Sequence, residues 1–187
     1  MSWLSRAFGS GESNSGSRPA AFASVAWVVV VNKPLYPLWI GWLVGEGAAA
    51  SMLTMATAPL YLLIALKAAT TPRLCWLLPA IGAADAFIGT KALGAGAAME
   101  AYLAPCAMLA ALAGSARDKA TTRVMLVMLF AAFVLLRLWQ PESLAVLSLH
   151  ATERLRDLNL FSVAGLMFFI GWRFADSDEP ISQKDAA

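Results

Sequence analysis

Long apolar runs, separated by charged residues, glycines or prolines, dominate the chain from residue 21 onward. A helix needs about 20 mostly apolar residues to cross a bilayer. Six runs approach that length: Ala21 to Val44, Ala49 to Leu66, Leu74 to Ala92, Ala98 to Gly114, Val124 to Trp139 and Leu160 to Phe174. The pattern predicts an all-α fold, a polytopic transmembrane helical bundle of about six spans. Because several runs are short, five spans is the alternative.

The two ends of the chain lack this apolar pattern. Residues 1–20 are rich in serine and glycine, a composition that predicts a flexible tail. Residues 176–187 form a short acidic tail. The transmembrane bundle is therefore expected to occupy residues 21–175, with the lipid bilayer as its surroundings.

Between the fifth and sixth runs, apolar residues recur at intervals of three and four. These residues are Leu144, Leu147, Ala151, Leu155 and Leu158. Such spacing places them on one face of a helix. It predicts a short amphipathic helix that lies on the extracytoplasmic membrane surface or caps the bundle, with Pro141 in its first turn.

The composition supports a membrane location and excludes one class of partner. Hydrophobic residues make up 59% of the chain and charged residues 14%, against about 45–50% and 25% in soluble domains. The net charge is only +2, and no dense basic stripe is present. No nucleic-acid partner is therefore expected.

The distribution of lysine and arginine predicts the orientation of the bundle. With six spans, nine basic residues fall on one side: Arg6, Arg18, Lys67, Arg73, Arg117, Lys119, Arg123, Arg173 and Lys184. Four fall on the other side: Lys91, Arg137, Arg154 and Arg156. The positive-inside rule then places both termini in the cytoplasm, with the chain in a bacterial inner membrane.

Sequence signatures of catalysis are missing from the chain. It has one histidine, and its two cysteines, Cys75 and Cys106, lie inside apolar runs without metal-ligand spacing. No Walker loop, dinucleotide-binding glycine motif, GxSxG or HExxH occurs. We therefore expect no metal, no cofactor and no catalytic residues, and an enzyme is the least favoured class. The two thiols are interpreted as buried structural residues.

Ionisable residues within the apolar runs are the main functional candidates, because a buried charge there costs roughly 3 kcal/mol even on the most lenient insertion scale. The candidates for a ligand site or ion pathway are Lys33, Tyr36, Asp85, Lys91, Glu100 and Arg137. Lys91 and Glu100 flank a glycine-rich connection and are expected to meet at the outer mouth of the bundle. There they either pin the hairpin or line the entrance to a cavity.

Asp85 lies among small residues near the centre of the third run and is expected to face the bundle interior. There it is either protonated or paired, and the partners considered are Lys33, Arg137, Thr54 and Thr57. Two roles are consistent with this position. One is a proton or cation site, and the other is an interhelical hydrogen bond.

The first run contains two prolines, Pro34 and Pro37, directly after Lys33 and on either side of Tyr36. Prolines remove backbone donors, so the spacing predicts a kink or break in mid-span. Broken helices build ligand sites in transporters, which makes this segment a candidate pocket. The alternative is that residues 21–31 form an oblique or interfacial helix, Lys33 extends to the headgroups, and the span begins near Pro34.

The first run also contains a GxxxG pattern formed by Gly41 and Gly45. Small residues four apart on a helix allow another helix to approach closely. The pattern predicts a helix-packing face or a homodimer contact.

Three segments resemble a known family. They are Asn32-Lys33-Pro34-Leu35-Tyr36-Pro37-Leu38-Trp39, GAGAAMEAYLAPC from Gly94 to Cys106, and LNLFSVAGLMFFIGWRF from Leu158 to Phe174. Together they resemble the MASE-like multi-helix membrane sensor modules of bacterial nucleotide cyclases and histidine kinases. The resemblance implies a sensory or accessory signalling bundle that transmits through its last span.

The chain departs from that family after its last apolar run. Only a short tail containing Asp176, Asp178 and Glu179 follows, in place of an output domain. A signal is therefore expected to pass to a separate partner protein. The alternative function is a small transporter or channel that uses the intramembrane aspartate, glutamate and lysine groups.

Overall fold

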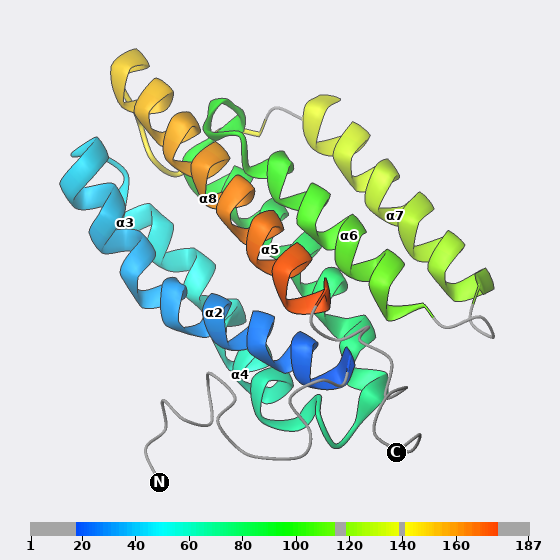
Figure 1. Ribbon diagram of the computed structural model, residues 1–187. Coiled ribbons are helices and arrows are strands. Elements are labelled where there is room, and N and C mark those ends of the chain that lie inside the picture. The colour runs from blue at the N-terminus through cyan, green and yellow to red at the C-terminus, as the bar shows by residue number, and fades with distance from the viewer. Residues whose placement is uncertain (1–17, 115–118, 139–140, 176–187) are drawn as a thin grey trace, which may run out of the picture.

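The computed structural model describes residues 18–114, 119–138 and 141–175, and the regular elements in this part of the chain are all helical (Figure 1). In chain order they are α2 (Arg18–Trp39), η1 (Ile40–Val44), α3 (Ala48–Ser51), η2 (Met52–Thr57), α4 (Ala58–Lys67), η3 (Pro72–Trp76), α5 (Leu77–Leu93), η4 (Ala95–Ala97), η5 (Met99–Tyr102), α6 (Leu103–Ala113), α7 (Lys119–Leu138) and α8 (Leu149–Ala175). Residues 1–17 of the predicted N-terminal tail and the acidic tail 176–187 lie outside the described residues.

Each of the six predicted spans contains helical structure, but the helices differ in length. Four segments are long and apolar enough to cross a membrane: Arg18–Val44, Ala48–Lys67, Lys119–Leu138 and Leu149–Ala175. The segment α5 has 17 residues, and Met99–Ala113 is a shorter apolar helix. The all-helical fold is confirmed for the described residues, whereas a count of six spans stays a prediction.

The outward surface of α7 is largely apolar. Within this helix the buried residues are Leu129 and Leu136. Val124, Val127 and Phe130 are each more than three-fifths exposed. A continuous apolar face of this size is unfavourable in water but is solvated by lipid acyl chains. The outward face of α7 therefore fits a membrane environment.

Helix α2 continues through both of its prolines. Pro34 and Pro37 lie inside the single helix Arg18–Trp39, which passes into the π-helical turn of η1 and ends at Gly45. Gly45 has a φ of 86°, in the left-handed region that favours glycine. The predicted break at Lys33 is therefore wrong, because neighbouring helices support a proline-containing membrane helix and compensate for its missing donors.

Helix α8 replaces the predicted surface helix. Residues 149–159 form the first turns of one continuous helix of 27 residues, and Ser148 Oγ accepts a hydrogen bond from Ala151 N at its start. Residues 141–148 have no helical structure; there, Leu144 N and Ala145 N donate to carbonyl groups at the end of α5. No separate amphipathic helix and no helical turn at Pro141 therefore occur in residues 141–175.

Four of the five residues in the apolar stripe assigned to that surface helix pack against the bundle, and Leu144 is 60% exposed. Ala151 and Leu155 are buried, and Leu158 packs against the same cluster. A helix of this length extends about 40 Å, which exceeds the bilayer hydrocarbon thickness of about 30 Å. The first turns of α8 can therefore extend beyond the hydrocarbon while their apolar side faces other helices.

Two apolar clusters mark the two ends of the bundle (Figure 1). At one end the rings of Phe22 and Phe174 meet edge to face with centroids 5.1 Å apart. At the other end Ile40 and Leu93 pack with Leu155. The start of α2 and the end of α8 therefore lie at the same end of the bundle.

Candidate functional site

Lys33 and Asp85 form a buried ion pair between α2 and α5. Lys33 Nζ lies 2.5 Å from Asp85 Oδ1 and 2.6 Å from Oδ2. The ammonium also donates to the Thr54 carbonyl at 2.5 Å, and Thr57 Oγ1 donates to Asp85 Oδ1 at 3.0 Å. Only 6% of Lys33 and 20% of Asp85 is exposed. The two charges neutralise each other, and each has a further polar partner.

The position of Lys33 decides between the two interpretations of the first span, a candidate pocket and a lysine that extends to the headgroups. Lys33 points into the bundle, so the interpretation in which it extends to the headgroups is wrong. Asp85 is paired with two of the partners considered, Lys33 and Thr57, whereas Thr54 contributes its carbonyl to Lys33. The carboxylate therefore forms interhelical bonds, and it also lines a cavity.

A second buried polar group joins α2 to α8. Tyr36 Oη donates to Asn159 Oδ1 at 2.8 Å, and Tyr102 Oη lies 3.4 Å from the same oxygen. Asn159 Nδ2 donates to the Ala97 carbonyl at 2.7 Å. Asn159 is fully buried, so these bonds satisfy an amide that would otherwise be costly in the core.

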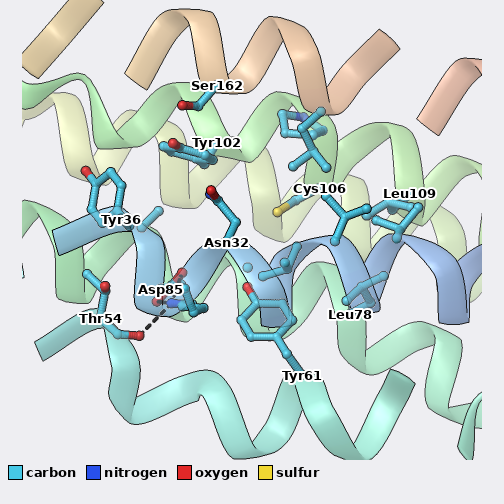
Figure 2. A pocket seen from close by; sticks show the side chains of 18 of the residues that line it. Asn32, Tyr36, Thr54, Tyr61, Leu78, Asp85, Tyr102, Cys106, Leu109 and Ser162 are labelled. Carbon is cyan, nitrogen blue, oxygen red and sulfur yellow. Dashed lines mark hydrogen bonds and ion pairs between the residues drawn. The ribbon is translucent and has the colours of Figure 1, made fainter. Parts of the chain in front are cut away.

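A cavity of about 360 Å³ lies in the bundle between these two polar groups and the apolar cluster around Phe22 (Figure 2). Helices α2, α5, α6 and α8 contribute most of its wall, together with single residues of η2 and α4 and two of η5. The lining residues are Val25, Val28, Val29, Asn32, Lys33, Tyr36, Thr54, Tyr61, Leu78, Gly82, Asp85, Ala86, Met99, Tyr102, Pro105, Cys106, Leu109, Ser162, Gly165, Leu166 and Phe169.

The wall of this cavity changes character from one side to the other. In Figure 2, Thr54 and Asp85 lie toward one side, and Leu78 and Leu109 lie toward the opposite side. The ring of Tyr61 lies between these sides, with its centroid 5.4 Å from Lys33 Nζ. The cavity therefore has a polar part with a charge-balanced pair and a larger apolar part.

The sulfur of Cys106 belongs to the cavity wall, whereas Cys75 packs in the apolar cluster around Phe22. Both thiols are nearly inaccessible, at 6% and 5% exposed. A Cβ added at Gly82 would collide with Cys106 Sγ. Glycine at position 82 therefore allows α6 to approach α5 closely at the cavity.

The remaining candidates lie away from the cavity. Lys91 Nζ donates to the Glu142 carbonyl at 2.7 Å. Glu100 Oε1 accepts from Arg137 Nη1 at 2.9 Å. The predicted meeting of Lys91 and Glu100 is therefore wrong, because the segment after α7 covers the end of α5 and Arg137 is the cation that reaches Glu100. None of these three candidates lines the cavity.

The glycine pair of the first span occupies an irregular segment. Gly41 lies in the π-helical turn η1, where an added Cβ would be 3.6 Å from Ala48 Cβ of the same chain. Gly45 ends that segment. The two glycines therefore do not share a regular α-helical face, and a homodimer through them stays a prediction.

Asn159, Tyr102 and Tyr61 are the site residues that sequence reasoning missed. Asn159 is a polar residue at the edge of the last apolar run, and this was the signal available for it. The two tyrosines lie within apolar runs and carry no charge, so the argument from a buried charge does not identify them. Their placement at one cavity depends on contacts between segments far apart in the chain.

Comparisons of this chain with models of protein families, with curated proteins and with solved structures find no match.

Proposed function

We propose that the chain is an integral membrane protein that binds a small ligand in the cavity beside Lys33 and Asp85, and that it acts as a sensory or accessory module through a separate partner protein. The observation that carries this proposal is the charge-balanced ion pair in the wall of a cavity of about 360 Å³. Buried ion pairs add little stability relative to apolar residues of similar volume. A pair that lines a cavity is therefore better explained by binding than by stability.

The alternative is a transporter or channel that uses the intramembrane charges as a path. Among the described residues, the cavity lining includes Lys33 and Asp85 but not Lys91, Glu100 or Arg137. The ionisable candidates therefore form separate local groups instead of one continuous polar route. This separation favours a binding site over an ion pathway.

The position of the ion pair also suggests how binding is transmitted. Lys33 and Tyr36 both belong to α2, and Tyr36 bonds to Asn159 of α8. A ligand that competes for Lys33 or Asp85 acts on α2, and through Tyr36 on the last helix. A ligand with different affinities for two arrangements of these helices shifts their populations.

The orientation proposed for this module follows from the positive-inside rule. Arg18 and Arg173 lie on α2 and α8 at the bundle end where Phe22 and Phe174 meet. An excess of lysine and arginine marks the cytoplasmic side of a bacterial inner membrane. We therefore place this end, and with it both termini, in the cytoplasm.

The cavity is tested by thiol modification in phosphatidylcholine liposomes. Methyl methanethiosulfonate, a small uncharged reagent, is expected to modify Cys106 faster than Cys75, with both rates measured by peptide mass spectrometry. Gly165→Leu is expected to slow the reaction of Cys106, because position 165 lines the cavity and an added Cβ meets nothing within 4 Å. Ala164→Leu is the matched control, because Ala164 is exposed on the same helix and does not line the cavity. Equal rates for the two thiols would contradict a binding cavity.

Transport is tested separately with the same liposomes and an internal pH dye. Under an imposed potassium gradient with valinomycin, the sensory proposal predicts no proton flux above that of protein-free liposomes. Flux through the wild type that disappears in Asp85→Asn would overturn the sensory proposal in favour of a transporter. Flux through the wild type and Asp85→Asn alike would also overturn it, since a conducting bundle is not a passive binding module.

A further inference from the structure

We infer that the ligand of this cavity is a single-chain amphiphile with an uncharged hydroxyl-type head, which enters sideways from the bilayer between α2 and α8. This inference rests on the proposed binding function and names its ligand class. Its basis is the combination of an apolar chamber, a charge-balanced polar end and an opening among lipid-facing residues.

The size of the cavity limits the ligand to one chain. An apolar cavity of about 150 Å³ binds benzene, and this cavity measures about 360 Å³. In proportion to the six carbons of benzene, the whole cavity has room for roughly 12 to 16 non-hydrogen atoms. A medium-length chain with a small head fits that volume, whereas a two-chain phospholipid does not.

The apolar part of the wall suits the chain of such a ligand. Leu78, Leu109 and Phe169 line it, and each of them comes from a different helix. Transfer of an alkyl chain from water to a site lined by such side chains is favourable, because it removes apolar surface from water. A chain that arrives from lipid gains much less, so the polar end must supply the selectivity.

The proposed opening lies midway along α2 and α8. The two helices are joined at one end by Phe22 and Phe174 and at the other by Tyr36 and Asn159. Between these contacts, Asn32 and Gly165 both line the cavity and are both exposed.

The surroundings of this opening are apolar. Leu35 on α2 and Phe161 and Phe168 on α8 are 39%, 80% and 73% exposed, respectively. Exposed side chains of this kind midway along membrane helices face acyl chains. The route into the cavity is therefore through lipid.

The polar end selects an uncharged head that both donates and accepts hydrogen bonds. Lys33 and Asp85 already balance each other, so an ionic head would add an unpaired charge to a buried site. A hydroxyl that displaces one of the two Lys33 to Asp85 hydrogen bonds can accept from the ammonium and donate to the carboxylate at once. Asn32, Tyr102 and Ser162 also line this region and supply neutral partners.

The experiment compares three probes with the same chain and different heads: 1-dodecanol, dodecanoate and dodecylamine. Wild-type protein in phosphatidylcholine liposomes is treated with methyl methanethiosulfonate at increasing probe concentration, and modification of Cys106 and Cys75 is measured in the same sample. We expect 1-dodecanol to slow the modification of Cys106 about tenfold when the free concentration of 1-dodecanol is about ten times its Kd. The rate of Cys75 is expected to stay unchanged, and the two ionic probes are expected to protect weakly.

Each alternative outcome has a distinct meaning. Protection of Cys106 by dodecanoate or dodecylamine equal to that by 1-dodecanol would overturn the uncharged head. If none of the three probes protects Cys106, the inference of an amphiphilic ligand is wrong. The proposed binding function would still stand in that case, provided that Cys106 reacts faster than Cys75 and that Gly165→Leu slows its reaction. A membrane-impermeant trimethylammonium thiosulfonate that modifies Cys106 faster than the uncharged reagent would overturn entry from the bilayer.

Discussion

The Lys33 and Asp85 ion pair makes a quantitative prediction for a double-mutant cycle. The perturbations are Lys33→Met, Asp85→Asn and the two combined. At the observed Nζ to Oδ1 distance of 2.5 Å, the Coulomb attraction is roughly 7 kcal/mol at an effective dielectric constant of about 20. Desolvation of both ions offsets much of that attraction. Removal of one partner, however, leaves the other as an uncompensated buried charge.

The size of each effect follows from the burial of the residue left behind. Asp85→Asn leaves a lysine that is 6% exposed, and we expect a loss of about 4 kcal/mol in the free energy of unfolding. Lys33→Met leaves a carboxylate that is 20% exposed, and we expect a loss nearer 3 kcal/mol. The double variant has no buried charge and is expected to lose less than either single variant.

The assay is unfolding by sodium dodecyl sulfate in mixed micelles, followed by far-ultraviolet circular dichroism. Reversibility is checked by dilution back into non-denaturing micelles. A double variant whose loss equals the sum of the two single losses would refute the reasoning, because additive losses mean that the two groups do not interact.

Three further predictions use the same unfolding assay. Asn159→Leu removes the oxygen that accepts from the buried Tyr36 hydroxyl, and it is expected to lower the free energy of unfolding by about 1 to 3 kcal/mol. An unchanged unfolding midpoint would contradict a stabilising role for that bond. Arg137→Gln leaves the Glu100 side chain, which is 11% exposed, without its cation and is expected to lower the free energy of unfolding by about 3 kcal/mol; a loss below about 1 kcal/mol would contradict this pairing. Gly82→Ala is expected to lower the midpoint because its methyl group would meet the neighbouring sulfur; Gly82→Ser, which is larger, should lower it further.

Much of the fold could be predicted because hydrophobic runs report helix positions directly. The limits of these runs fall close to those of the helical segments, as with Leu74 to Ala92 and α5. The prediction of boundaries was wrong at α8, where the apolar stripe from Leu144 to Leu158 suggested a separate helix. Nothing in Leu149–Ala175 terminates a helix, and the stripe that seemed to face the membrane surface contacts other helices.

The site was harder to predict because its bonds join residues far apart in the sequence. Burial of a charge identified Lys33 and Asp85 as candidates, and that argument needs no tertiary structure. Their pairing does need it, since they are 52 residues apart. For Glu100, the sequence favoured the nearby Lys91 as the partner. The structure instead pairs Glu100 with Arg137, which is 37 positions away.

The double variant also separates the stability of the bundle from its binding function. If Lys33 and Asp85 served only to hold α2 against α5, neutral side chains of similar volume would replace them without further effect. The proposed function requires more, because the head of a ligand needs a donor at Lys33 and an acceptor at Asp85. The Lys33→Met/Asp85→Asn protein should therefore keep its fold while 1-dodecanol loses most of its protection of Cys106. Equal protection in this protein and in the wild type would mean that the apolar chamber alone binds the chain, and the ion pair would then have no part in recognition.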